Sequence, residues 1–234
     1  MRLPTEEHRK HAWLVSTLAP DFELLDVWRY PIELDQSIPL ERFIDFMESS
    51  QRDLVSSRGA AGALFRLRAV LGRVFGWDGD GDDGGSGSGG KPAPALPIPE
   101  CTETSLRDRL SDADLAGERA ASRAEAAGAA SPRFKPVYRR ANETLLEISN
   151  NTVHALLHLG RVDISATRWS PQLGVYVKPR GKLGRYYMGL ISPFRHYVVY
   201  PAMMRAAKRG WPQYAQRHTI GKSGESGESG EQHV

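Results

Sequence analysis

A nearly uncharged aromatic stretch in the C-terminal third constrains the fold most strongly. Residues 164–224 contain eleven Lys and Arg, nine aromatic residues and no Asp or Glu. Within this region, the run 186–204 is almost as long as a membrane span, but Arg195 and His196 lie at its centre. An Arg at mid-span costs about 2.5 to 3.5 kcal/mol on insertion scales. We therefore expect this run to pack against the protein's own core.

The same stretch predicts a long C-terminal helix over 185–209. Its Tyr, Phe and Met residues recur at spacings that give a helix a broad apolar face, which is typical of a helix that covers a sheet. Pro193 and Pro201 should kink this helix or divide it into segments.

The chain is predicted to be a cytoplasmic protein. Its formal net charge is only +3, because residues 1–163 carry 20 Lys and Arg against 25 Asp and Glu. Cys101 is the single cysteine, so an intrachain disulfide cannot form, and the chain fits a reducing compartment. The first ten residues are charged and lack the apolar core of a signal peptide.

Low-complexity segments limit the part of the chain that can fold. Gly, Ser, Asp and Pro dominate 78–95, Ala dominates 111–131, and repeated Ser-Gly-Glu triplets fill much of 219–234. The first two compositions predict flexible inserts and the third a disordered tail. We expect one domain over 1–218 that contains both inserts.

Hydrophobic periodicity predicts a mixed order of elements in this domain. The expected elements are a strand over 23–34 that is interrupted or ended near Pro31, helices over 39–48 and 60–75, a hairpin of 143–149 and 152–162 around Asn150-Asn151, and a strand over 173–177. With the C-terminal helix, this order predicts an α+β fold.

Several segments together resemble a known family. They are 148–160 (ISNNTVHALLHLG), 175–179 (VYVKP), 184–201 with its Pro-Phe-Arg-His-Tyr core, 20–28 (PDFELLDVW) and 71–78 (LGRVFGWD). These segments resemble the bacterial domain-of-unknown-function 2867 (DUF2867) family. The resemblance implies a fold related to the helix-grip superfamily of START lipid-transfer domains and birch-pollen-allergen-like proteins. In that fold an antiparallel sheet curls around a long C-terminal helix and leaves an apolar cavity, whereas the family label itself carries no activity.

His154 and His158 are the candidates for catalysis. If they lie on a strand, they share one face but stand about 13 Å apart, too far to bind one zinc ion together. One interpretation is that both are hydrogen-bonded to neighbours on the sheet. The other is that one of them lines the cavity as a general base.

The candidates for ligand contact lie in or near the C-terminal helix. A buried guanidinium needs a partner, so Arg195 should meet solvent, an acid such as Glu147, or an anionic group of a ligand. His196, Tyr186 and Tyr187 would supply further polar contacts in a mainly apolar pocket.

Other functional classes have weaker support in the sequence. Asp78, Asp80 and Asp82 imitate the start of a calcium loop, but Gly89 occupies the position of its bidentate Glu. We therefore predict no metal site, and no fingerprint of a cofactor, a phosphate loop or a Ser-His-Asp hydrolase is visible. The basic residues lack a nucleic-acid module, which argues against nucleic acid as a partner.

Three functions follow in order of preference. The first is binding of a mainly apolar small molecule, lipid-like or polyketide-like, between the sheet and the C-terminal helix. The second is a cavity enzyme of the cyclase or dehydratase kind, with His154 or His158 as general base. The third is a non-catalytic module whose basic C-terminal face binds an anionic membrane or an acidic partner.

Overall fold

A seven-stranded antiparallel sheet organises the molecule. The computed structural model describes residues 1–56, 105–116, 135–149, 153–181, 188–189, 192–193 and 195–220. The strands are β1 (Arg2–Leu3), β2 (Glu23–Arg29), β3 (Leu34–Asp35), β4 (Lys135–Arg139), β5 (Glu143–Ser149), β6 (Val153–Asp163) and β7 (Arg168–Pro179). They follow the order β1-β2-β7-β6-β5-β4, and β3 also pairs with β7.

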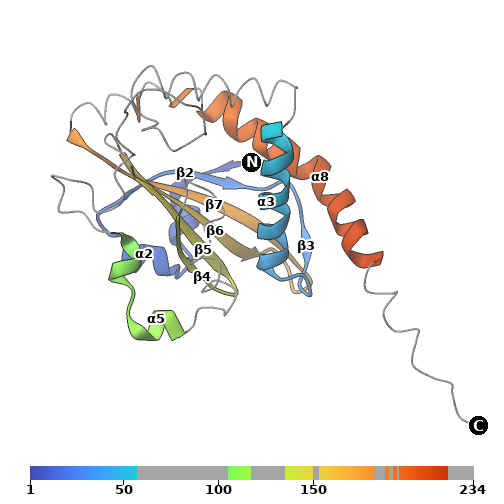
Figure 1. Cartoon of the computed structure of the whole chain (residues 1–234), viewed down its shortest axis with the longest axis horizontal. Helices are drawn as coiled ribbons and strands as arrows, with labels where there is room; N and C mark the ends of the chain where they lie inside the picture. Colours follow the sequence, from blue (N-terminus) through green and yellow to red (C-terminus); the bar gives the residue numbers. More distant parts are fainter. Residues whose placement is uncertain are drawn as a thin grey trace, which may run out of the picture.

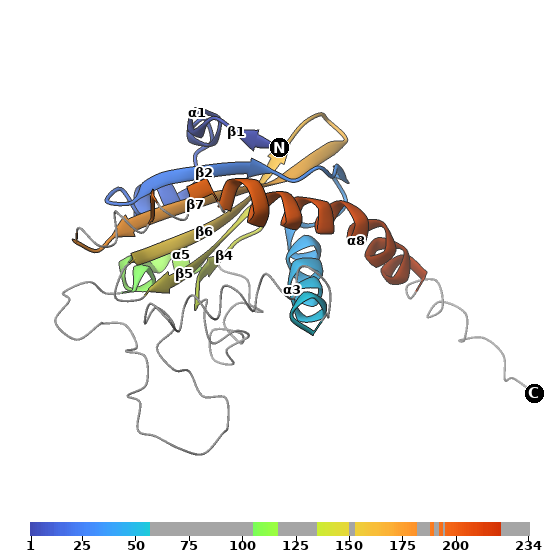
Figure 2. The same ribbon diagram turned by 90° about the horizontal axis from the view of Figure 1, so that it is seen from above.

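Helices pack on both faces of this sheet. They are α1 (Thr5–Arg9), α2 (Leu14–Leu18), α3 (Leu40–Ser56), the 3₁₀ turn η1 (Leu106–Arg109), α5 (Asp112–Ala116), the π-helical turn η2 (Arg195–Val199) and α8 (Tyr200–Ile220). Helix α8 runs across one face of the sheet with α3 beside it (Figures 1 and 2). The molecule is therefore α+β, with an antiparallel sheet and a C-terminal helix, as the sequence predicts.

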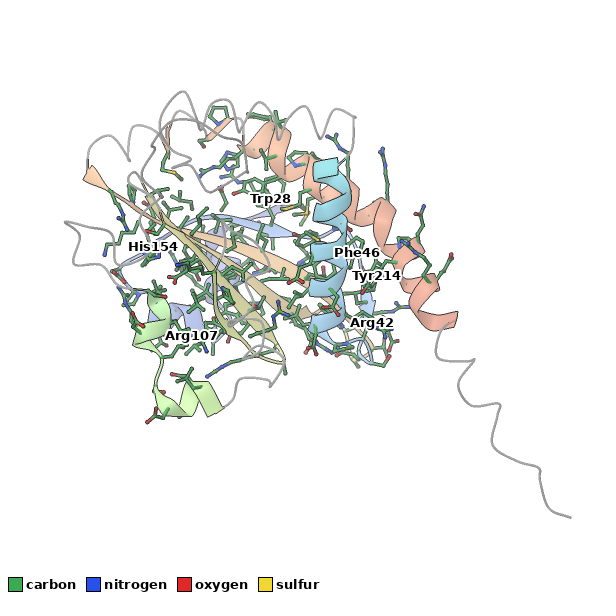
Figure 3. The ribbon with its side chains drawn as sticks, viewed as in Figure 1. Trp28, Arg42, Phe46, Arg107, His154 and Tyr214 are labelled. Atoms are coloured by element: carbon green, nitrogen blue, oxygen red, sulfur yellow. The ribbon has the colours of Figure 1, made fainter. Side chains whose placement is uncertain are left out.

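The face under α3 and α8, here called the α8 face, carries the larger apolar cluster. Phe46 from α3 packs against Trp211 and Tyr214 from α8, with ring centroids 5.5 and 5.4 Å apart (Figure 3). The sheet contributes the following buried residues to this cluster: Trp28, Val153, Trp169, Leu173, Val175 and Val177.

The opposite face, here called the N-terminal face, is covered by α1, α2 and η1. Its buried cluster joins side chains of these short helices to alternate positions of the strands. The cluster includes Trp13, Val15, Leu18, Val27, Leu106, Leu145, Leu156 and Tyr176. Because side chains alternate along a strand, each long strand supplies both faces.

Two glycines let the N-terminal segment lie directly on the sheet. A Cβ atom at Gly160 would stand 2.7 Å from Trp13 Cη2, and one at Gly174 would stand 2.8 Å from the His8 ring. These separations are shorter than van der Waals contact, so only glycine leaves room for the indole and the imidazole at these two positions.

Most of the predicted strands are confirmed. The hairpin strands correspond to β5 and β6, which pair in register from Glu143↔Gly160 to Ser149↔His154. The predicted strand 23–34 ends at Arg29 and resumes briefly as β3, and 173–177 is the centre of the longer β7. The sequence did not predict β1 and β4, which are short edge strands.

The C-terminal helix extends further than the prediction, and the predicted start at residue 185 lies outside the described residues. Residues 195–199 form a π-helical turn, and α8 then continues to Ile220, through Pro212. Pro201 does not break α8, because it lies in the first turn, where its missing N–H is not needed. The change from π to α geometry occurs next to this residue.

Two other predictions are only partly covered by the described residues. The helix 39–48 is confirmed as α3, which runs eight residues further, to Ser56, whereas the predicted helix 60–75 and the insert 78–95 lie outside the described residues. The insert predicted over 111–131 begins with the ordered helix α5, in which Asp114 accepts a hydrogen bond from Arg140 at 2.6 Å.

Candidate functional site

A buried carboxylate on the α8 face forms the centre of the candidate site. Asp26 is 1% exposed and lies in β2. A β-bulge between Leu24 and Asp26 shifts the pairing with β7, so that Leu25 and Asp26 both contribute to the α8 face. Bulges of this kind re-aim side chains and are frequent beside active sites.

Among the described residues, four side chains contact Asp26. His196 Nε2 is hydrogen-bonded to Oδ1, and the Tyr200 hydroxyl donates a hydrogen bond to Oδ2 at 3.0 Å. Arg195 approaches Oδ2 at 3.4 Å, and the mostly exposed Arg2 approaches Oδ1 at 3.9 Å. The turn η2 therefore places two consecutive polar residues of the aromatic run, Arg195 and His196, against one acid.

The cationic groups around Asp26 exceed the charge that they neutralise. One carboxylate faces two guanidinium groups, and the side chains of Arg195 and His196 remain 15% and 17% exposed. Among the described residues, the buried Nε of Arg195 and the buried Nε1 of Trp28 have no hydrogen-bond acceptor. Buried donors normally have acceptors, so this site has donors to spare for a further acceptor group.

The polar centre shares its face of the sheet with apolar side chains. Trp28 packs on Tyr200 with ring centroids 5.0 Å apart. Several hydrophobic residues next to the buried cluster keep part of their surface exposed, namely Leu25, Ala155, Leu157, Leu159, Met188 and Met203. Apolar walls with a few convergent polar groups are the usual composition of small-molecule sites.

An open depression lies next to the site. It has a volume of about 450 Å³ and is lined by residues 2–6 and by Leu25. Arg2 belongs both to this depression and to the contacts of Asp26.

The Tyr200 hydroxyl stays protonated over the physiological pH range and acts as a hydrogen-bond donor in this site. Burial raises the pKa of its hydroxyl well above the ordinary value, and the neighbouring charge of Asp26 raises it further. Because the phenol stays protonated, it donates a hydrogen bond to Asp26.

The predicted catalytic histidines lie on the other face of the sheet. His154 and His158 are fully buried on β6, under the short helices and not under α8. Trp28 and His154, which belong to opposite faces, are both labelled in Figure 3. A general-base role in a cavity under the C-terminal helix does not fit this placement.

Each of these histidines contacts a glutamate of β5, and each glutamate also holds a short helix. His154 Nε2 lies 3.2 Å from Glu147 Oε2, which accepts the Leu106 N–H at the start of η1. His158 Nε2 lies 2.9 Å from Glu143 Oε2, which also accepts the Tyr138 hydroxyl. The interpretation that both histidines are hydrogen-bonded to neighbours on the sheet is confirmed.

Glu143 holds α2 in the way that Glu147 holds η1. Both carboxylate oxygens of Glu143 accept the Leu14 N–H, at 3.0 and 3.2 Å. Burial is the largest single influence and raises the pKa of Glu143 and Glu147, but the hydrogen bonds that each carboxylate accepts from its histidine, a backbone N–H and a hydroxyl, with the charge of that histidine, together outweigh burial, and both pKa values are lowered. Burial lowers the pKa of His158, against the partial compensation from Glu143.

The candidate ligand contacts separate into two groups. Arg195 and His196 meet at Asp26, whereas Tyr186 and Tyr187 lie outside the described residues. Glu147 was the wrong partner for Arg195, because its side chain is on the N-terminal face. The true partner, Asp26, was missed, although an acid between the apolar Leu25 and Val27 of a predicted strand was a visible signal.

The described residues contain neither a candidate metal centre nor a candidate membrane span. No group of three or more His, Cys, Asp and Glu side chains in these parts of the chain is arranged to hold a metal ion. No helix within them is both long enough and apolar enough to cross a membrane.

Comparisons with known proteins identify the family. No curated protein and no solved structure matches the chain. The sequence profile of a family described as "Protein of unknown function (DUF2867)" matches residues 18–202. The matched region runs from the end of α2 to the start of α8 and contains Asp26, Arg195, His196 and Tyr200. Because the match covers most of its length, the chain belongs to the DUF2867 family.

Proposed function

We propose that the protein binds a mainly apolar small molecule on the α8 face and holds its anionic end at Arg195. The ligand would be lipid-like or polyketide-like, with a carboxylate or phosphate at one end. The relationship to the helix-grip superfamily belongs to this proposal, and it is supported by the antiparallel sheet with a C-terminal helix across one face.

The observation that carries the proposal is the excess of donors around Asp26. Two guanidinium groups and one imidazole surround one carboxylate, and Arg195 Nε has no acceptor among the described residues. An anion placed here would use this donor and balance the second positive charge. Charge-assisted hydrogen bonds contribute about 1.5 to 3 kcal/mol each.

The apolar surroundings would bind the rest of the molecule. Leu25, Ala155, Leu157 and Met203 are only partly buried, so an alkyl chain or ring system that covered them would remove more apolar surface from water. Each buried methylene contributes about 0.8 kcal/mol. Affinity should therefore rise with the length of the apolar part.

The test compares two ligands that differ only at the polar end. Native mass spectrometry of protein purified from its own host should first show whether a small molecule is retained. Titration calorimetry with dodecanoate and dodecanol should then give at least about tenfold tighter binding for the carboxylate. Equal affinity for the two would contradict an anionic anchor, and binding of neither would contradict a ligand site.

A second candidate function uses the outer side of α8. Its exposed residues include Arg205, Lys208, Arg209 and Arg217, the helix contains no acidic residue, and Tyr197 just before it is 81% exposed. A basic face with an interfacial Tyr is suited to an anionic membrane surface. Liposome flotation should then show binding to vesicles with anionic lipid that weakens with salt, and binding to neutral vesicles at equal strength would contradict this candidate.

A further inference from the structure

The polar centre of the candidate site also has the arrangement of a proton-transfer pair. We propose that His196 is a general base on the α8 face, that Asp26 is its positioning residue, and that the substrate is an apolar carbonyl compound with a C–H bond next to the carbonyl. This inference rests on the proposed function, because it places a substrate in the same apolar site.

The hydrogen bonds fix the tautomer of His196. Asp26 is acceptor-only when ionised, so the ring nitrogen that contacts it, Nε2, carries the proton. The other nitrogen, Nδ1, then has a free lone pair and accepts at most a long hydrogen bond from the Ser192 hydroxyl, at 3.3 Å. A substrate C–H group that displaced this hydroxyl would meet an unprotonated imidazole nitrogen.

Asp26 supports the charge that forms on His196 during the reaction. When Nδ1 takes a proton, the ring becomes cationic, and the carboxylate at Nε2 stabilises it. Asp26 is held in place by Tyr200 at 3.0 Å, and it is 1% exposed. Its orientation is thus set by the protein and not by water.

Arg195 is placed to stabilise the opposite charge. In the step, the C–H bond next to the carbonyl breaks, its proton moves to Nδ1, and its electron pair forms the enolate, whose oxygen becomes negative. The guanidinium, whose Nε has no acceptor within the described part of the chain, would bind that oxygen. The proton then returns to carbon, or it leaves with a β-hydroxyl group as water, so that no oxidant or reductant is needed.

His154 and His158 differ from His196 in accessibility. Both contact a glutamate through Nε2, and His158 Nδ1 has no partner among the described residues, but both imidazoles are fully buried under the short helices, and their glutamates anchor η1 and α2. The side chain of His196, by contrast, is 17% exposed. The geometry therefore assigns proton transfer to His196.

The experiment measures proton exchange on a simple ketone. The full-length protein is incubated with 2-octanone in D₂O, and ¹H NMR follows the loss of the protons next to the carbonyl from pH 6 to 9. Saturation-transfer NMR on the same samples reports binding of the ketone. We expect wild-type protein to exchange these protons about 100-fold faster than His196→Gln, within the range of a positioned general base.

Two further variants separate catalysis from folding. Asp26→Asn should slow exchange about tenfold while saturation-transfer NMR still shows binding of the ketone, because the cationic imidazole that forms in the reaction loses the carboxylate that stabilises it. His11→Gln, at a histidine near the opposite face, should leave the rate unchanged. Circular dichroism confirms that each variant is folded before its rate is compared.

The outcomes distinguish the two proposals. If the ketone binds but wild-type protein exchanges its protons no faster than His196→Gln, the general-base assignment is overturned and ligand binding stands. If dodecanoate binds and the ketone does not, the carbonyl substrate is overturned. If neither binds, the ligand site itself fails, and the proton-transfer site fails with it.

Discussion

The two faces of the sheet bury similar acidic groups in opposite ways. On the N-terminal face, Glu143 and Glu147 are matched by histidines and by the N–H groups of helix ends. On the α8 face, Asp26 faces two guanidinium groups and an imidazole, and the side chains of Arg2, Arg195 and His196 are partly exposed.

Burial alone therefore does not distinguish the two faces. The N-terminal face also holds buried polar atoms that have no partner among the described residues, such as His158 Nδ1 and Trp13 Nε1, but these side chains lie beneath the short helices. The cluster at Asp26 differs from them in its excess of positive charge and in the partial exposure of Arg195 and His196, and these two properties suit it to take up another molecule.

The largest effect is expected when matched acids are replaced on the two faces. Glu143→Gln puts an amide N–H₂ against buried donors from Leu14, Tyr138 and His158, and should lower the free energy of unfolding by about 2 to 4 kcal/mol. Asp26→Asn should cost about 1 kcal/mol, because Arg2, Arg195 and His196 can turn to water. Urea denaturation of both variants measures the difference, and equal losses would remove the contrast.

The glycines give a second comparison of the faces. Gly160→Ala places a Cβ 2.7 Å from Trp13 and should cost about 1 to 3 kcal/mol by overpacking. At Gly210 in α8 the added Cβ would lie 3.1 Å from Phe46, and the helix gains about 1 kcal/mol from replacing glycine, so Gly210→Ala should be nearly neutral. Thermal unfolding compares the two, and a greater loss at Gly210 would contradict the account.

The N-terminal face should also make stability depend on pH. Burial, with the nearby charges of His158 and His11, lowers the pKa of His8 to about 3, and burial lowers that of His158. Both histidines are neutral in the folded protein but take up protons in the unfolded chain. Their contribution to the free energy of unfolding is therefore complete above pH 6.5 and is lost as the pH falls. Each adds at most about 1.4 kcal/mol per pH unit.

His8→Gln isolates one of these groups. The relevant window lies between pH 6.5 and 4.5, the ordinary pKa values of His and Glu. Because His8 is one of two histidines with a lowered pKa, the variant should lose about half of the wild-type slope of unfolding free energy against pH in this window. The lowered pKa values of Glu143 and Glu147 affect stability only below this window, because their contribution is lost below the unfolded pKa of about 4.5. An unchanged slope would mean that His8 does not titrate with unfolding.

The sequence predicted the elements of the fold better than the site. Strand alternation located β5, β6 and β7, and apolar spacing located α3 and the C-terminal helix. The partner of Arg195 could not be found in this way. Asp26 lies 169 positions away in the sequence, and the two side chains come together only because η2 and α8 pack on β2. Nor could spacing tell which face His154 and His158 occupy, since both faces of β6 are apolar.

The N-terminal segment was missed for a related reason. Helices α1 and α2 have five residues each, too few for a periodic pattern. They are held by long-range contacts, such as Glu143 with Leu14 and Gly174 with His8. Only the fold brings these pairs together.

The most direct test of the α8 face as a ligand site compares two arginines of the C-terminal helical region. Arg195→Gln removes the guanidinium beside Asp26, whereas Arg205→Gln removes an exposed guanidinium. Both substitutions lower the net charge by one. Calorimetric titration should show that Arg195→Gln loses most of the preference for dodecanoate over dodecanol, about tenfold, and that Arg205→Gln keeps it. An unchanged preference in Arg195→Gln, or the same loss in both variants, would contradict the account.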